Sequence, residues 1–185
     1  MEKIVDVLIV GAGISGIGIA AHLAKNSPQR QFEIIERRDS IGGTWDLFRY
    51  PGIRPDSDMS TFGFNFKPWR SANVLAAGPA IKGYLGEVVD EFDLKKKIHF
   101  KHRVLAANYD TAKKKWFVEI EDANQKRQTW IANFVVGCTG YYNYDHGFEP
   151  DFPNKDIFKG QFIHPQHWPE NLDYTGKKVV IIGSG

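Results

Sequence analysis

Residues 11–16, Gly-Ala-Gly-Ile-Ser-Gly, have the spacing G-x-G-x-x-G, and an acid, Glu36, stands 20 residues after the last of these glycines. In such a pattern Gly11 permits a tight turn, Gly13 lets the backbone approach a pyrophosphate, and Gly16 lets a helix pack closely against a strand. The N-terminus of that helix offers free N–H groups and a positive dipole end to phosphates. Glu36 is placed to accept a hydrogen bond from a ribose hydroxyl, and its charge disfavours a 2′-phosphate. The pattern predicts a dinucleotide site that prefers FAD or NAD to NADP.

The segments around these glycines predict the elements that must position them. The aliphatic run at 5–10 is typical of a strand buried on both faces, and residues 32–35 predict a second strand that ends at Glu36. Between them, residues 17–25 are rich in Ala, Ile and Leu and precede a stop signal, which predicts a helix. A lone G-x-G-x-x-G also occurs in glycine-rich surface turns, but here strand, helix and acid agree. We therefore expect an α/β, Rossmann-like fold.

Composition limits the class of protein. The chain has 185 residues, is 42% hydrophobic and carries a net charge of +2, so nothing indicates a nucleic-acid partner. Cys138 is the only cysteine, which excludes an internal disulfide and a redox CxxC pair; we expect an inert, buried thiol. No apolar run approaches the ~20 residues of a membrane span, and the short stretch before the first strand leaves no room for a signal peptide, so we expect none. We expect a cytoplasmic protein without a transmembrane segment. His99 and His102 are too loosely placed to predict a metal site.

The middle of the chain predicts one helix and a set of short strands. Apolar positions with helical spacing predict a helix over 79–92. Strands are expected at 98–100, 103–109, 116–120 and 128–131, the later ones joined by polar turns as an antiparallel β-meander, and a further buried strand is expected at 134–137. Aromatic residues alternate with others over 62–69, and we expect them to pack around a flavin ring or to line an apolar entrance.

A second glycine pair, Gly42-Gly43, directly follows the expected acid, and Thr44 and Trp45 come next. Adjacent glycines let the backbone come close to a flat or phosphorylated ligand, which the next two side chains can cover. With the first glycine motif and Glu36, the run GGTWDLF resembles the FAD domain of the FAD- and NADPH-dependent class B flavoprotein monooxygenases of the Baeyer–Villiger type. The resemblance implies FAD contacts at these positions and also at Ser15, Asp46 and Leu47.

Residues 49–58, RYPGIRPDSD, resemble the RYPG-x-R-x-D stretch of the same family. The resemblance implies that Arg54 and Asp56 lie at the cofactor site, and that Asp56 pairs with a catalytic arginine much later in the chain. It also implies that the backbone near Val104 contacts the FAD adenine. From the residues alone, Asp56 or Ser57 is as readily the cap of a short helix.

Two further stretches predict the domain organisation. Residues 158–169 match the Baeyer–Villiger fingerprint FxGxxxHxxxWP, in which the resemblance makes His164 a conformational residue of an interdomain linker. The aliphatic run at 177–182 followed by Gly-Ser-Gly repeats the opening pattern and resembles the start of a second Rossmann domain, for NADPH. We expect an FAD-binding domain at 1–140 that lacks its C-terminal return, a linker at 141–176, and the first strand of a truncated NADPH-binding domain at 177–185.

The resemblance implies a monooxygenase that uses FAD, NADPH and O2 to oxygenate ketones, or sulfur and nitrogen centres, of small apolar substrates. Among subgroups, the sequence looks similar to ethionamide-activating monooxygenases and to those of long-chain alkane degradation. One alternative is an N- or S-oxygenating flavin monooxygenase of the N,N-dimethylaniline type. Another is a non-catalytic FAD-binding fragment. The chain is expected to be an N-terminal fragment that does not turn over NADPH alone, because its NADPH site is incomplete.

Overall fold

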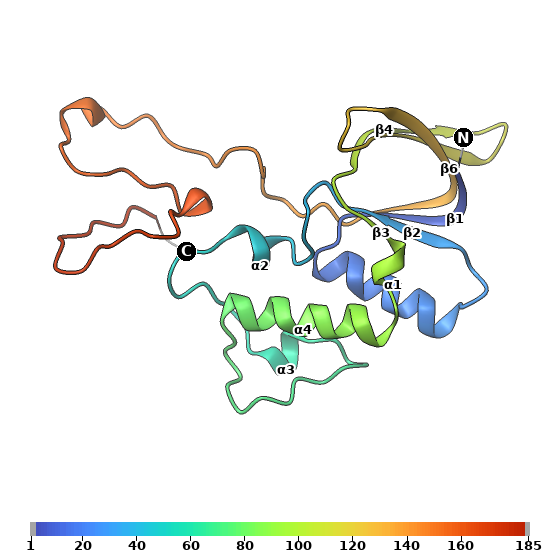
Figure 1. Ribbon diagram of the computed structural model, residues 1–185, viewed down its shortest axis with the longest axis horizontal. Helices are drawn as coiled ribbons and strands as arrows, with labels where there is room; N and C mark the ends of the chain where they lie inside the picture. Colours follow the sequence, from blue (N-terminus) through green and yellow to red (C-terminus); the bar gives the residue numbers. More distant parts are fainter. Residues whose placement is uncertain (1–2, 184–185) are drawn as a thin grey trace.

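The computed structural model describes residues 3–183 and is built around one six-stranded sheet (Figure 1). The strand order is β3-β2-β1-β6-β5-β4, in which β3, β2, β1 and β6 are parallel and β6, β5 and β4 are antiparallel. The strands are β1 Lys3–Val10, β2 Phe32–Ile35, β3 Ile98–His99, β4 Arg103–Asp110, β5 Lys115–Glu121 and β6 Arg127–Gly137. The expected α/β class, with a parallel sheet and an antiparallel meander, is confirmed.

The parallel part and the meander share strand β6. Two strands were expected here, at 128–131 and 134–137, but β6 is one strand of 11 residues. Its first half pairs antiparallel with β5, as Trp116 with Ala132, while residues 130–137 pair in parallel with β1. Because each edge of β6 finds a partner over part of its length, the strand continues without a break. Phe134 is 67% exposed, so the expectation that this segment is buried throughout is wrong.

Two long helices lie against one face of the sheet, below it in Figure 1. They are α1 (Ile14–Asn26) and α4 (Gly78–Glu91), whose bounds agree with the predicted helices to within a turn. The fully buried side chains of Ile17 and Leu85 belong to the same core cluster as Ile34 of β2. Single-turn elements complete the described part: α2 (Thr44–Leu47), α3 (Met59–Phe62), η1 (Lys95–Lys97), η2 (Lys155–Ile157) and η3 (Pro165–His167).

The aromatic segment after α3 packs on these helices. Phe64 stacks on Phe66 and on Tyr84 of α4, with ring centroids 4.9 Å and 5.8 Å apart, and Trp69 meets the same tyrosine edge-on at 5.7 Å. A Cβ on Gly18 of α1 would stand only 2.7 Å from Phe64. These aromatics fill the space beside α1 and α4, and none of residues 62–69 lines the pocket described below, so the expectation that they line an apolar entrance is not met there, while a contact with the flavin stays a prediction.

The short helix α3 begins at a cap different from those proposed from the sequence. Asp58 accepts hydrogen bonds from the N–H groups of Ser60 and Thr61, at 2.8 Å and 3.1 Å. These donors hold the pKa of the Asp58 carboxyl below its usual value. The cap is thus neither Asp56 nor Ser57.

Residues 141–183 leave β6 and run away from the sheet as an irregular segment with two 3-10 turns, drawn in orange and red in Figure 1. The strand expected at 177–182 does not form within the described residues, and Val179 to Ile182 are 60–87% exposed. A strand needs neighbours to satisfy its backbone groups, and this segment pairs with none among the residues described. The last two residues of the expected Gly-Ser-Gly lie outside the described range. Assignment of this stretch to an NADPH domain, and the domain limits, stay predictions.

Candidate functional site

The turn between β1 and α1 has the backbone geometry that its glycines predict. Gly11 has φ +111°, and a Cβ there would stand 2.3 Å from the carbonyl oxygen of Cys138. A Cβ on Gly16 would stand 1.9 Å from the carbonyl oxygen of Gly11. Neither contact is tolerated between non-bonded atoms. Gly11 therefore has its tight-turn role, and Gly16 allows α1 to pack against the turn.

The first turn of α1 is open to an anion. Gly13 is the N-cap, no side chain caps the helix, and its first turn carries no acidic residue. Ser15, in this first turn, has an exposed side chain. The N–H groups of a helix start and the dipole of the helix favour a phosphate at such a position.

Glu36 is buried, with 6% of its surface exposed, directly after β2. Its Oε2 accepts a hydrogen bond from the Ala12 N–H at 2.7 Å, and its Oε1 accepts one from the Arg38 N–H at 2.9 Å. The carboxylate thus fixes the glycine turn, a structural role that the sequence did not indicate. A carboxylate has about four acceptor positions, so capacity remains for a ribose hydroxyl.

The second glycine pair lies against the first motif. Gly42 donates a hydrogen bond to the carbonyl of Ala12 at 3.0 Å, and both Gly42 and Gly43 have positive φ. A Cβ on Gly43 would stand 3.1 Å from the Cα of Gly13. The two turns face each other backbone to backbone at Gly13 and Gly43. We call these turns, residues 11–16 and 42–44, the cradle; its bare backbone and open helix N-terminus fit the pyrophosphate of a dinucleotide such as FAD.

The helix α2 carries Thr44, Trp45, Asp46 and Leu47 and begins directly after Gly43. The Asp46 side chain is 3% exposed and forms ion pairs with Arg38, at 2.6 Å, and with Lys82 of α4. Arg38 also donates to the carbonyl of Gly43 at 3.3 Å. The Asp46 carboxylate therefore anchors α2, and its two partners were missed because they lie on other elements, with no local signal in the sequence.

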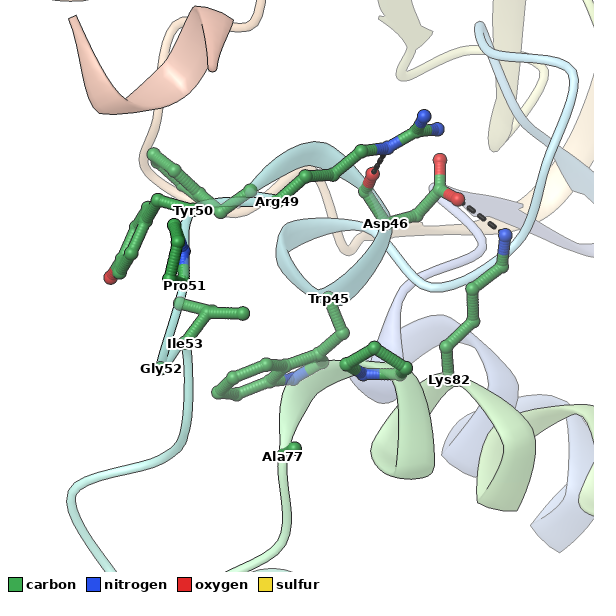
Figure 2. Close-up of a pocket in the computed structure, with 11 residues that line it drawn as sticks. Trp45, Asp46, Arg49, Tyr50, Pro51, Gly52, Ile53, Ala77 and Lys82 are labelled. Atoms are coloured by element: carbon green, nitrogen blue, oxygen red, sulfur yellow. Dashed lines mark hydrogen bonds and ion pairs between the residues drawn. The ribbon is translucent and has the colours of Figure 1, made fainter. Parts of the chain in front are cut away.

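A pocket of about 490 Å³ opens beside α2 (Figure 2). Its wall includes the Trp45 indole, the start of α4 and the segment that follows α2; the lining residues are Trp45, Asp46, Phe48, Arg49, Tyr50, Pro51, Gly52, Ile53, Ala77, Pro79 and Lys82. Figure 2 shows Lys82 directed from α4 toward Asp46. The predicted site residues Arg54 and Asp56 are exposed and do not line the pocket.

The remaining predicted site residues lie apart from the cradle. Val104 is half-buried on β4 beside a register shift, with its side chain packed against a second core cluster that includes Trp130. His164 precedes η3, where its Nδ1 accepts from the Gln166 N–H at 3.2 Å. Gln166 is itself buried and donates from Nε2 to the Asn143 carbonyl at 2.7 Å. His164 thus belongs to a local network of the segment after β6, and its predicted role in conformational change stays a prediction.

Cys138, at the end of β6, is half-buried in contact with the core. Burial raises the pKa of its thiol, which favours the unreactive protonated form. No group of three or more potential metal-ligating His, Cys, Asp or Glu side chains occurs among residues 3–183. No helix in this described part is long and apolar enough to cross a membrane.

Comparison with known proteins agrees with this geometry. The family model for flavin-binding monooxygenase-like proteins matches residues 58–185, and that for NAD(P)-binding Rossmann-like domains matches residues 9–75. The chain is 87% identical to the probable FAD-binding monooxygenase AlmA of Acinetobacter baylyi and about 55% identical to the FAD-containing monooxygenase EthA of Mycolicibacterium smegmatis. Both matches cover 100% of this chain, which spans 37% of the length of each relative.

Solved structures also match this chain over nearly its whole length. An oxidized steroid monooxygenase bound to NADP superposes with a TM-score of 0.82 at 31% identity, over 99% of this chain and 35% of that one. The OTEMO complex with FAD and NADP superposes with a TM-score of 0.77 at 28% identity, over 100% of this chain and 36% of that one. The expected family and fold are confirmed, and this chain is shorter than its relatives. The chain belongs to the flavin-binding monooxygenase-like family.

Proposed function

We propose that this chain forms the FAD-binding part of an NADPH-dependent flavin monooxygenase. The observation that carries the proposal is the cradle, in which Gly13 and Gly43 face each other beside the open N-terminus of α1. The FAD pyrophosphate would lie between these turns, with a ribose hydroxyl at Glu36. Bound FAD would supply hydride acceptance and the activation of O2. The chain's own part is to hold and orient this cofactor.

Two observations support a substrate class for the longer protein. We propose that the longer protein oxygenates ketones, or sulfur and nitrogen centres, in small apolar molecules, including intermediates of long-chain alkane degradation. The fingerprint at 158–169 supports the Baeyer–Villiger reaction, and the pocket beside Trp45 is lined largely by apolar and aromatic residues. In this proposal Arg54 and Asp56 serve the reaction centre, the backbone at Val104 contacts the adenine, and His164 acts through the linker.

Titration of the 185-residue chain with FAD tests the cofactor part. We expect saturable quenching of flavin fluorescence with one FAD per chain. Gly13→Val should abolish it, because a side chain would enter the narrow gap between the two turns. Gly86→Ala on α4 is the control, because its added Cβ would meet open space beside the helix. Absence of binding by the unaltered chain would refute the proposal.

The reaction is tested on the longer protein, supplied with NADPH, O2 and either a methyl ketone or an organic sulfide. An ester from the ketone supports the Baeyer–Villiger reaction. A sulfoxide without any ester would instead assign the protein to the N- and S-oxygenating flavin monooxygenases.

A further inference from the structure

Tyr144 reaches the cradle from the segment that follows β6. Figure 1 shows this segment leaving the sheet near the loop that leads into α2. The point at which a Gly43 Cβ would stand is 3.3 Å from the Tyr144 hydroxyl oxygen and 3.1 Å from the Cα of Gly13. The phenol oxygen therefore lies next to Gly43, beside the place where the two glycine turns approach each other.

The Tyr144 side chain is half-buried at this position and its ring faces a cation. The Arg38 guanidinium carbon lies 5.6 Å from the ring centroid, and Arg38 is itself fixed by Asp46. Burial raises the pKa of the Tyr144 phenol, while the Thr44 side chain and Arg38 act in the opposite direction. Because the net shift is upward, the phenol is protonated at neutral pH and can donate a hydrogen bond.

The neighbours of Tyr144 along the chain hold it in place from both sides. Asp145 forms an ion pair with Arg37, which stands directly after Glu36. The carbonyl of Asn143 accepts a hydrogen bond from buried Gln166 at 2.7 Å. The phenol is thus presented to the cradle by a segment that is anchored to the sheet on one side and to the fingerprint on the other.

We propose that Tyr144 is a cofactor-binding residue whose hydroxyl donates a hydrogen bond to the pyrophosphate of FAD. The cradle also offers backbone N–H groups and the Ser15 and Thr44 hydroxyls, and a phenol O–H beside Gly43 adds a further side-chain donor for a phosphate oxygen. The inference rests on the proposed function, because it needs FAD in the cradle. It adds to that function a contact made by the segment that carries the fingerprint.

The test compares Tyr144→Phe with Tyr141→Phe in the 185-residue chain. Both substitutions remove one hydroxyl and keep the ring, but Tyr141 is 87% exposed. We expect Tyr144→Phe to raise the dissociation constant for FAD about tenfold or more, as for one lost hydrogen bond to a charged group. Tyr141→Phe should leave the dissociation constant within about twofold of that of the unaltered chain.

Two further measurements separate binding from a merely structural role. The ³¹P resonances of bound FAD should shift in Tyr144→Phe and not in Tyr141→Phe, whereas the urea midpoint of the unliganded chain should be the same in both. Unchanged FAD affinity in Tyr144→Phe would overturn the inference. So would weakened affinity with unchanged ³¹P resonances and a lowered urea midpoint, because the hydroxyl would then only stabilise the fold. Failure of the unaltered chain to bind FAD would instead refute the proposed function, and this inference with it.

Discussion

Replacing Asp46 of α2 with asparagine removes the negative charge that pairs with both Arg38 and Lys82. The Asp46 side chain is only 3% exposed. Breaking a fully buried ion pair costs about 3–5 kcal/mol, because the remaining charge is left uncompensated. Here the side chains of Arg38 and Lys82 are 21% and 37% exposed, so water compensates part of their charge. We therefore expect the free energy of unfolding to fall by about 2–3 kcal/mol.

Urea unfolding followed by tryptophan fluorescence measures this change, and Asp145→Asn is the matched control. That substitution also removes a carboxylate paired with an arginine, but the side chains of Arg37 and Asp145 are 38% and 55% exposed. Exposed ion pairs contribute only about 0–1 kcal/mol. The unfolding free energies of the two variants should therefore differ by at least ~1 kcal/mol, with Asp46→Asn the less stable.

Lys82→Met, alone and combined with Asp46→Asn, measures the coupling between Asp46 and Lys82 directly. Contacting charges at a buried site are expected to show an interaction energy of about 0.5–3 kcal/mol in such a cycle. A coupling near zero, or equal losses in Asp46→Asn and Asp145→Asn, would refute the view that a buried charge cluster holds α2.

Three other changes test the turn, the helix and the thiol. Gly16→Ala should abolish FAD binding in the fluorescence titration, because its Cβ would stand 1.9 Å from a backbone oxygen; retained binding would contradict the close helix packing. Gly83→Ala should raise the free energy of unfolding, measured in urea, by about 0.5–1 kcal/mol, because Gly83 lies inside α4 with open space around the added Cβ. A lower free energy of unfolding would contradict this. Cys138 should react with iodoacetamide more slowly in the folded chain than in urea, because burial raises its pKa; equal rates by mass spectrometry would contradict a protected thiol.

The cradle could be predicted because its signal is local. Gly11 needs a positive φ, and both Gly11 and Gly16 need close backbone approaches that only glycine provides, so the spacing of the motif specifies a turn without knowledge of distant contacts. The strand β2 has the predicted bounds, and the acid after it lies against the glycine turn, where Glu36 accepts from Ala12. Short-range constraints of this kind carry over directly from sequence to structure.

The missed features depend on contacts between distant segments. Alternation over 62–69 predicts an extended segment beside a ligand, but Phe64 and Phe66 pack against α1 and α4. The spacing of these residues does not show which element they pack against. The strands expected at 128–131 and 134–137 form one continuous strand, because β5 pairs with its first part and β1 with its second. In both cases the packing or pairing partner lies on an element distant in the chain, and a single sequence does not show which element that is.

The buried charge cluster connects the stability of α2 to the electrostatics of the cradle. Asp46, Arg38 and Lys82 together carry one surplus positive charge, which offsets the charge of the buried Glu36 carboxylate beside Ala12, and Arg38 donates a hydrogen bond to the carbonyl of Gly43. The diphosphate of a dinucleotide carries about two negative charges, so this offset of the Glu36 charge and the α1 N-terminus act in the same direction. The surplus resides on a cluster that also fixes the helix after Gly43. The carboxylate that fixes the glycine turn is therefore balanced by cations that stand outside the gap where glycine backbone must approach a phosphate.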